Sequence, residues 1–247
     1  MRKVPLFPLL LGLFSTAFPR PAQAQAVGEP SLGGSQSFGI ISSYAPNSSH
    51  ILIGLAQDRR TFTLGVQYSH LLWSDRNIFR YDYEASFLPL FKESDPTVIG
   101  TTTTIGGQTY FTPQAPVRVT YVEQGPVGTA SDGSQTAPIY AIYGRETTYA
   151  TALTPLGIRM TARPWERFEP TFALDLGFVL SPRNIPIDNS TSFNFLFSFG
   201  PGIEIYANQH TSWRVEYLYR HMSNAGSGEF NPGVDQGILQ LTLNHHR

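Results

Sequence analysis

The stretch "SFNFLFSFGPGIEIY", residues 192–206, alternates between large apolar side chains and small or polar ones. One set of alternate positions holds Phe193, Phe195, Phe197, Phe199, Ile203 and Ile205, and the other holds Asn194, Ser198, Gly200, Gly202 and Glu204. Successive side chains of a β-strand point to opposite faces of the sheet. The pattern therefore predicts a strand with one apolar face and one polar face.

Alternating segments of this kind recur along the chain. We count eight, near 37–46, 60–74, 77–92, 147–162, 168–181, 191–206, 211–224 and 235–245. At 147–162 the sequence does not indicate which face is apolar. Many of the segments exceed the roughly 9–11 residues that a tilted strand needs to cross a bilayer. No segment after the N-terminus is apolar for the length of a spanning helix, so a membrane location requires a barrel.

The links between the segments alternate in length. The stretches "SDRN", "PWER" and "ANQH" are short, whereas the links at 46–59, 93–146, 182–190 and 225–234 are longer. Outer-membrane barrels have short turns on one side of the membrane and long loops on the other. The sequence thus predicts an all-β fold, an eight-stranded antiparallel transmembrane β-barrel with one long external loop at 93–146. This segment is either a mobile loop or holds a small hairpin around "QTYFTP" and "VRVTYVEQG".

Alternation alone leaves two kinds of barrel open. A soluble barrel of the lipocalin type turns its aromatic face inward, whereas a membrane barrel turns that face to lipid and encloses the polar one. In the membrane barrel the interior would hold Arg80, Asp82, Glu84, Asp175, Glu204, Arg214 and Glu216. Both signs of charge occur in this set, so a paired network is possible, and we favour the membrane barrel.

Bulk composition narrows the classes of partner and compartment. The chain has 247 residues and a formal net charge of −1, so nothing in it indicates a nucleic-acid partner. It has no cysteine, which excludes disulfides and thiolate metal sites. Residues 1–24 have the form of a signal peptide, with a positive start, an apolar run and "AQA" at the cleavage site. A Gly/Ser-rich leader at 25–36 then precedes the barrel at 37–247.

The strand predicted at 211–224 carries a histidine and a serine on its apolar face. Trp213, Val215, Tyr217, Tyr219, His221 and Ser223 share this face by parity. Next-but-one residues of a strand lie roughly 6.5–7 Å apart, a gap that side chains can close. An imidazole can take the proton of a neighbouring hydroxyl and make it a nucleophile, provided that a third group orients the imidazole. Antiparallel pairing across 225–234 brings Asp235 close enough to be that group.

A plainer interpretation of the same residues stays open at this point. Serine and histidine are common near strand ends, and an aspartate that opens a strand is often only a turn residue. His245 and His246 are adjacent, so on a strand they face opposite ways and make a poor pair of metal ligands. We therefore predict no metal and no cofactor.

The segment "HMSNAGSGEFNPGVD", residues 221–235, resembles the signature of the PagL family, the outer-membrane lipid A 3-O-deacylases. The resemblance covers roughly 167–245 well and the first hairpin less well. The matching positions are His221, Ser223, Asn224, Ala225 and Gly226, then Asn231, then Asp235 where the family carries its acid.

This resemblance implies a Ser-His-acid triad that faces lipid on the outer side of a barrel in a Gram-negative outer membrane. Ser223 would be the nucleophile, His221 the general base and Asp235 the orienting acid. The resemblance suggests Asn231 and the backbone N–H of Gly226 as donors to the oxyanion, while a turn-forming role is open for Asn224. The chain departs from the family in three respects. Its acid, Asp235, has a shorter side chain than the family's acid, its link at 93–146 is longer, and its last residues are "LTLNHHR".

The sequence therefore predicts a serine esterase that removes an ester-linked acyl chain from lipid A of lipopolysaccharide. The alternative is a non-catalytic barrel of the same fold that acts as a structural or surface-interaction protein through 93–146. A soluble secreted carrier of a ligand is a third possibility.

Overall fold

A computed structural model describes residues 33–75, 78–162 and 167–247. The predicted signal peptide and most of the predicted leader lie outside the described residues. The strands are β1 (Gln36–Ala45), β2 (Arg60–Asp75), β3 (Phe79–Ile105), β4 (Gln108–Arg118), β5 (Gly128–Ser131), β6 (Thr136–Ala162), β7 (Phe168–Ile185), β8 (Thr191–Asn208), β9 (Thr211–Ser223) and β10 (Val234–His246). Within the described residues, none of the secondary structure is a helix suited in length and apolarity to crossing a membrane.

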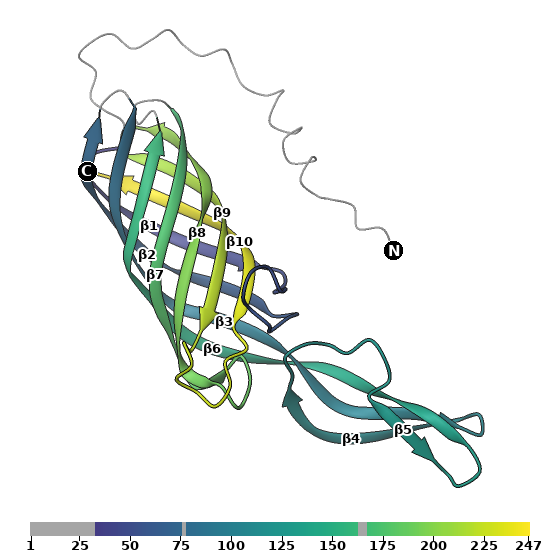
Figure 1. Cartoon of the computed structure of the whole chain (residues 1–247). Coiled ribbons are helices and arrows are strands. Elements are labelled where there is room, and N and C mark those ends of the chain that lie inside the picture. The colour runs from purple at the N-terminus through teal and green to yellow at the C-terminus, as the bar shows by residue number, and fades with distance from the viewer. Residues whose placement is uncertain (1–32, 76–77, 163–166) are drawn as a thin grey trace, which may run out of the picture. The chain divides into compact units, whose positions relative to one another are not determined.

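Eight of these strands close into an antiparallel ring (Figure 1). The order is β3-β2-β1-β10-β9-β8-β7-β6, and pairing of β3 with β6 completes it. Each predicted segment corresponds to one strand of the ring, so the predicted barrel is confirmed. Following paired residues once around the ring from Asp235 returns to β10 at His245, near its other end. This offset is what tilts the strands of a closed barrel.

The interior of the ring is polar and charged. All seven residues predicted to point inward are buried: Arg80, Asp82, Glu84, Asp175, Glu204, Arg214 and Glu216. A further cation, Arg159 of β6, lies 3.1–3.3 Å from carboxylate oxygens of Asp82, Glu84 and Glu204. Charges taken out of water are tolerated only when they are paired in this way. The lipocalin-like alternative is therefore excluded, because its enclosed face would be the apolar one.

The outer wall of the ring carries the apolar side chains. Exposed examples from β2, β7 and β8 are Phe62, Leu64, Val66, Phe172, Leu174, Leu176, Phe193 and Phe195. Such a belt is stable against hydrocarbon and costly against water. The barrel therefore has the surface of a membrane protein.

A β-bulge explains why the sequence of 147–162 gave no clear face. Pairing of β6 with both neighbours shifts around Pro155. Before the bulge the even-numbered Ala150 and Ala152 are buried, and after it the odd-numbered Arg159 and Thr161 are buried. One extra residue reverses which parity points inward, so a single alternating pattern cannot describe the whole segment.

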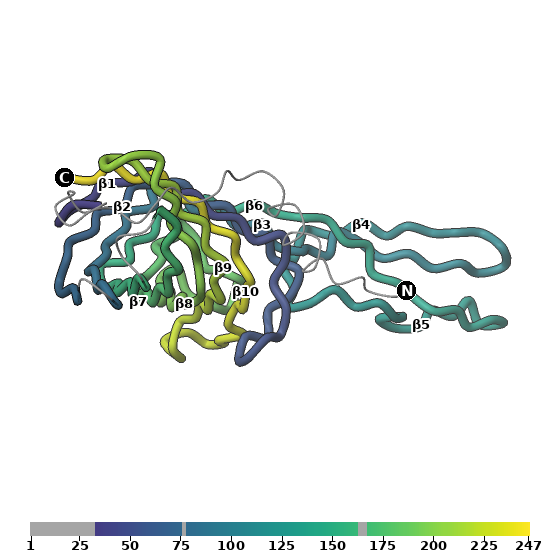
Figure 2. The backbone as a smooth tube through the Cα atoms, turned by 90° about the horizontal axis from the view of Figure 1, so that it is seen from above, coloured from purple at the N-terminus to yellow at the C-terminus, as the bar shows by residue number. Residues whose placement is uncertain are grey.

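The link at 93–146 is mostly sheet. Ring pairing of β2 with β3 ends at Ser94, but β3 and β6 continue to pair as far as Thr103 and Ile139. β4 adds to β3 and β5 adds to β6, which makes a four-stranded extension that we call the arm, residues 95–146 (Figure 2). A hairpin is present, as one interpretation predicted, but "QTYFTP" pairs with the end of β3 rather than with the stretch after it.

Candidate active site

His221 and Asp235 face each other across the β9–β10 ladder on the outer wall. They are directly paired residues, and His221 Nδ1 lies 2.7 Å from Asp235 Oδ1. A carboxylate only accepts hydrogen bonds, so in the neutral imidazole Nδ1 carries the proton and Nε2 keeps its lone pair. This is the tautomer that a general base needs.

Ser223 lies at the same place on the wall, two residues beyond His221. Both side chains line a hollow with Leu176, Gly177, Phe195, Leu196 and Phe197 of β7 and β8. The Ser223 hydroxyl makes no hydrogen bond to any residue that the structure describes. Catalytic hydrogen bonds are often long before substrate binds and tighten in the complex. The lack of a hydrogen bond between Ser223 and His221 is therefore compatible with a nucleophile and its base.

Asp235 is held by more groups than the sequence indicated. Tyr219 Oη donates to Oδ1 at 2.8 Å, and the backbone N–H groups of Leu52 and Ile53 donate to Oδ2 at 2.7 and 2.9 Å. With His221, four donors converge on one carboxylate, which is fully buried. The charged form of a carboxylate is stabilised by such donors. Parity placed Tyr219 on the face of His221, but nothing in the sequence indicated that the β1–β2 link returns to this acid.

Two glycines permit the close approach of backbone around the pair. A Cβ on Gly54 would lie 2.5 Å from Asp235 N and 2.8 Å from its carboxylate carbon. A Cβ on Gly233, which has a φ of +58°, would lie 2.9 Å from His221 Cε1. Any side chain at either position would push the backbone away from Asp235 or His221. The absence of a Cβ atom at Gly54 and Gly233 therefore allows the backbone to pack closely against Asp235 and His221.

Asn224 fixes the loop between β9 and β10. Its buried side chain donates to Ser190 Oγ at 3.2 Å and to the carbonyl of Phe230 at 3.0 Å. Its Oδ1 accepts the N–H of Gly226 at 2.9 Å. The turn-forming role that the sequence left open for Asn224 agrees with these contacts.

The two residues suggested as oxyanion donors differ in their availability. The amide N–H of Asn224 donates to Asn231 Oδ1 at 3.2 Å, which orients the exposed Asn231 side chain. The Nδ2 of Asn231 has no partner among the described residues and is free to donate. The N–H of Gly226 is already used by Asn224, so it would have to share or break that bond to reach an oxyanion.

Replacing Asn224 by alanine should loosen the loop and lower activity about tenfold or more. Three side-chain hydrogen bonds are lost, to Ser190 Oγ, to the carbonyl of Phe230 and from the N–H of Gly226, and the groups that they satisfied remain. Each buried group left unpaired costs roughly 1–3 kcal/mol. Rates of ester cleavage and limited proteolysis of residues 224–233 measure the effect. Asn208→Ala, in an exposed turn at the other end of the barrel, is the control. A loop as resistant as that of the wild type, with full activity, would contradict this role.

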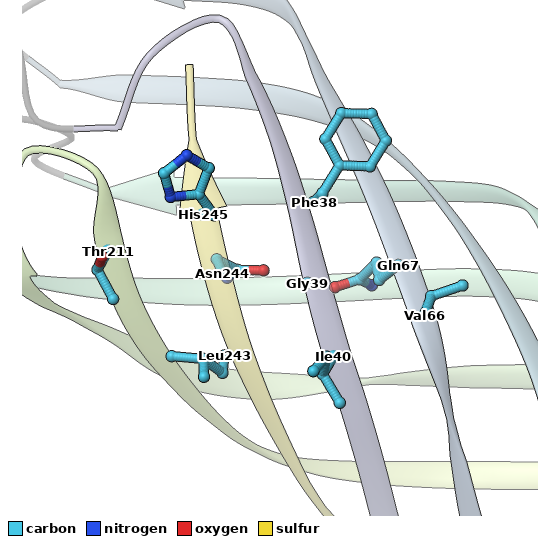
Figure 3. Close-up of a pocket in the computed structure, with 9 residues that line it drawn as sticks. All are labelled: Phe38, Gly39, Ile40, Val66, Gln67, Thr211, Leu243, Asn244 and His245. Carbon is cyan, nitrogen blue, oxygen red and sulfur yellow. The ribbon is translucent and has the colours of Figure 1, made fainter.

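A second hollow lies at the opposite end of the barrel and lacks comparable chemistry. It is lined by Phe38, Gly39, Ile40, Val66, Gln67, Thr211, Leu243, Asn244 and His245 (Figure 3). Among the described residues that line it, His245 is the one ionisable residue. The neighbouring His246 points inward, where its Nε2 lies 2.7 Å from Ser212 Oγ. The two histidines thus face opposite sides of the wall, as predicted.

Comparisons with known proteins match one family model, and the solved structures that resemble the chain include two outer-membrane proteins. The family model described as lipid A 3-O-deacylase (PagL) matches residues 109–244. No curated protein matches the chain in sequence. The crystal structure of the outer membrane enzyme PagL aligns at 13% identity and a TM-score of 0.46, covering 83% of this chain and 97% of its own. The solution structure of the E. coli outer membrane protein W aligns at 9% identity and a TM-score of 0.36, covering 87% and 99%.

Proposed function

Because the chain belongs to the lipid A 3-O-deacylase (PagL) family of outer-membrane ester hydrolases, we propose that it is a serine esterase that removes an ester-linked acyl chain from lipid A. Ser223 is the nucleophile, His221 the general base and Asp235 the acid that orients it. The observation that carries this assignment is the 2.7 Å contact between His221 Nδ1 and Asp235 Oδ1, beside Ser223 on one apolar hollow.

The chemistry follows from the free lone pair on His221 Nε2. Ser223 Oγ attacks the ester carbonyl carbon while Nε2 takes the hydroxyl proton, and the Asp235 carboxylate stabilises the imidazolium that forms. The tetrahedral intermediate collapses, and the sugar hydroxyl leaves with the proton from Nε2. Water then attacks the acyl-serine with His221 again as base, which releases the fatty acid and restores the enzyme.

The oxyanion of each tetrahedral intermediate needs donors that are already in position. The free Nδ2 of Asn231 supports its assignment as one donor. The N–H of Gly226 is the second, and it turns from Asn224 Oδ1 to the oxyanion when substrate binds.

The position of the site on the outer wall suits a lipid substrate. The acyl chain of lipid A lies in the leaflet beside a barrel rather than inside it, and here the interior is filled by charged side chains. Leu176, Phe195 and Phe197 line the hollow next to Ser223 and offer an apolar wall along which such a chain can lie. The substrate therefore reaches the serine from the membrane and needs no pore.

The test is the composition of lipid A in a Gram-negative host that expresses the chain. Mass spectrometry should show lipid A that lacks one acyl chain, together with the matching free fatty acid. Migration on unheated gels checks that the barrel is folded in the outer membrane. Unaltered lipid A in cells with a folded barrel would contradict the proposal and favour the non-catalytic surface protein.

A further inference from the structure

The link between β1 and β2 exposes a cluster of large apolar side chains. Ile51, Leu52, Ile53 and Leu55 are 46%, 59%, 65% and 48% exposed. No Asp, Glu, Lys or Arg occurs from Asn47 to Gln57. An apolar, uncharged segment of this kind is unfavourable in water, so something apolar is expected to cover it.

This segment lies against the outer wall at the start of β10. Ser48 and Ala56 form bridges to Gln236 and Val234, and the N–H of Leu55 donates to the carbonyl of Pro232 at 2.5 Å. In Figure 1 the dark blue segment runs beside the beginning of β10. Its apolar side chains are thus placed next to the belt of the barrel, where exposed Tyr44 and Leu239 belong to β1 and β10.

We propose that residues 51–55 are inserted among the acyl chains of the outer leaflet, and that this insertion holds the acid of the triad in place. The partner is hydrocarbon, since the cluster continues the surface by which the barrel already meets the membrane. The effect on catalysis rests on the function proposed above.

Leu52 and Ile53 couple insertion to the position of Asp235, because the same two residues face the lipid and bind the carboxylate. The side chains of Leu52 and Ile53 point outward, while their backbone N–H groups donate to Asp235 Oδ2. If the side chains leave the lipid, the two N–H groups leave the carboxylate. Asp235 then keeps only Tyr219 and His221 as side-chain donors. Tyr219 and the Leu52–Ile53 amides are therefore positioning groups that act through Asp235.

The absence of cysteine from the chain allows the insertion to be measured directly. Ile53→Cys provides a single thiol for a nitroxide in barrels reconstituted into bilayers. Relaxation of the nitroxide by oxygen, which partitions into lipid, is compared with relaxation by a water-soluble nickel chelate. Leu241→Cys on the wall of β10 is the lipid control, and Ser134→Cys in the exposed turn after β5 is the water control.

We expect the label at 53 to respond as the label at 241 does, with oxygen the stronger relaxant. A response like that at 134 would place the loop in water and overturn the proposal. Protection from both relaxants would mean that protein covers the cluster, a second copy for example, and would overturn it equally. The measurement does not depend on activity, so a barrel that fails to cleave lipid A can still confirm the inserted loop.

The coupling to catalysis is tested by changing the polarity of one side chain. Ile53→Asn keeps the backbone N–H but disfavours insertion, and should lower lipid A cleavage in bilayers about tenfold or more. Ile53→Leu keeps the apolar surface and should retain more than half of the wild-type rate. Heat-dependent gel migration checks that both variants are folded. Equal rates for the Asn and Leu variants, beside an active wild type, would overturn the coupling.

Discussion

Ser223→Ala should abolish deacylation, with a loss of at least about 10³-fold, and leave the barrel folded. In the proposed mechanism the hydroxyl oxygen forms the acyl intermediate, and alanine offers no substitute. The side chain is half-buried at the edge of a hollow and has no hydrogen bond among the described residues. Its removal therefore leaves no buried group unpaired and no closed cavity.

The measurement is cleavage of a defined lipid A ester by the purified barrel, together with mass spectrometry of lipid A from cells. Ser192→Ala is a matched control, because Ser192 is exposed on neighbouring β8. It should behave as the wild type does. Trimming of lipid A by the Ser223 variant at the wild-type rate would remove Ser223 from the mechanism.

The ring of strands could be predicted from sequence because lipid on one side and charge on the other impose strict alternation. The stretch 192–206 shows this most clearly, and the structure places Phe193 and Phe195 outward and Glu204 inward. The prediction weakened only where a bulge at Pro155 changes the parity of β6. A bulge depends on pairing with both neighbouring strands, and a single sequence does not carry that information.

The arm was harder to predict for a different reason. Its strands are largely exposed on both faces, as all residues of β4 before Arg118 are. Without a buried face there is no selection for alternation, so the continuation of β3 and β6 beyond the ring has no periodic pattern. Clusters of Thr, Gly and Pro then suggest a loop where pairing in fact continues.

Part of the candidate site could likewise be predicted from the sequence, and part could not. Parity placed His221 and Ser223 on one face, and antiparallel pairing across 225–234 placed Asp235 beside them. The amides of Leu52 and Ile53 could not be predicted, because backbone donors have no residue type that marks them. They come from a link more than 180 residues away in the chain, and only the closed ring brings β1 against β10.

The hydrogen bonds to Asp235 determine how the side chain of an asparagine at this position is oriented. The amides of Leu52 and Ile53 donate to Oδ2, so the oxygen of an asparagine will occupy that position and its NH₂ group will replace Oδ1. The NH₂ group then faces His221 Nδ1 and must donate to it. The imidazole proton moves to Nε2, the atom that accepts the proton of Ser223 in the proposed mechanism.

Asp235→Asn should therefore lower turnover on the order of 10²–10⁴-fold, through the wrong tautomer and the loss of charge beside the imidazolium. Asp235→Glu keeps the charge and the correct tautomer. It should retain more activity than the Asn variant, although Leu52, Ile53 and Gly54 must move to admit one more methylene. The measurement is turnover of a defined lipid A ester by each purified barrel in detergent. If asparagine at position 235 supports the rate that aspartate does, the triad is wrong, and the reaction runs on Ser223 and His221 alone or at another place.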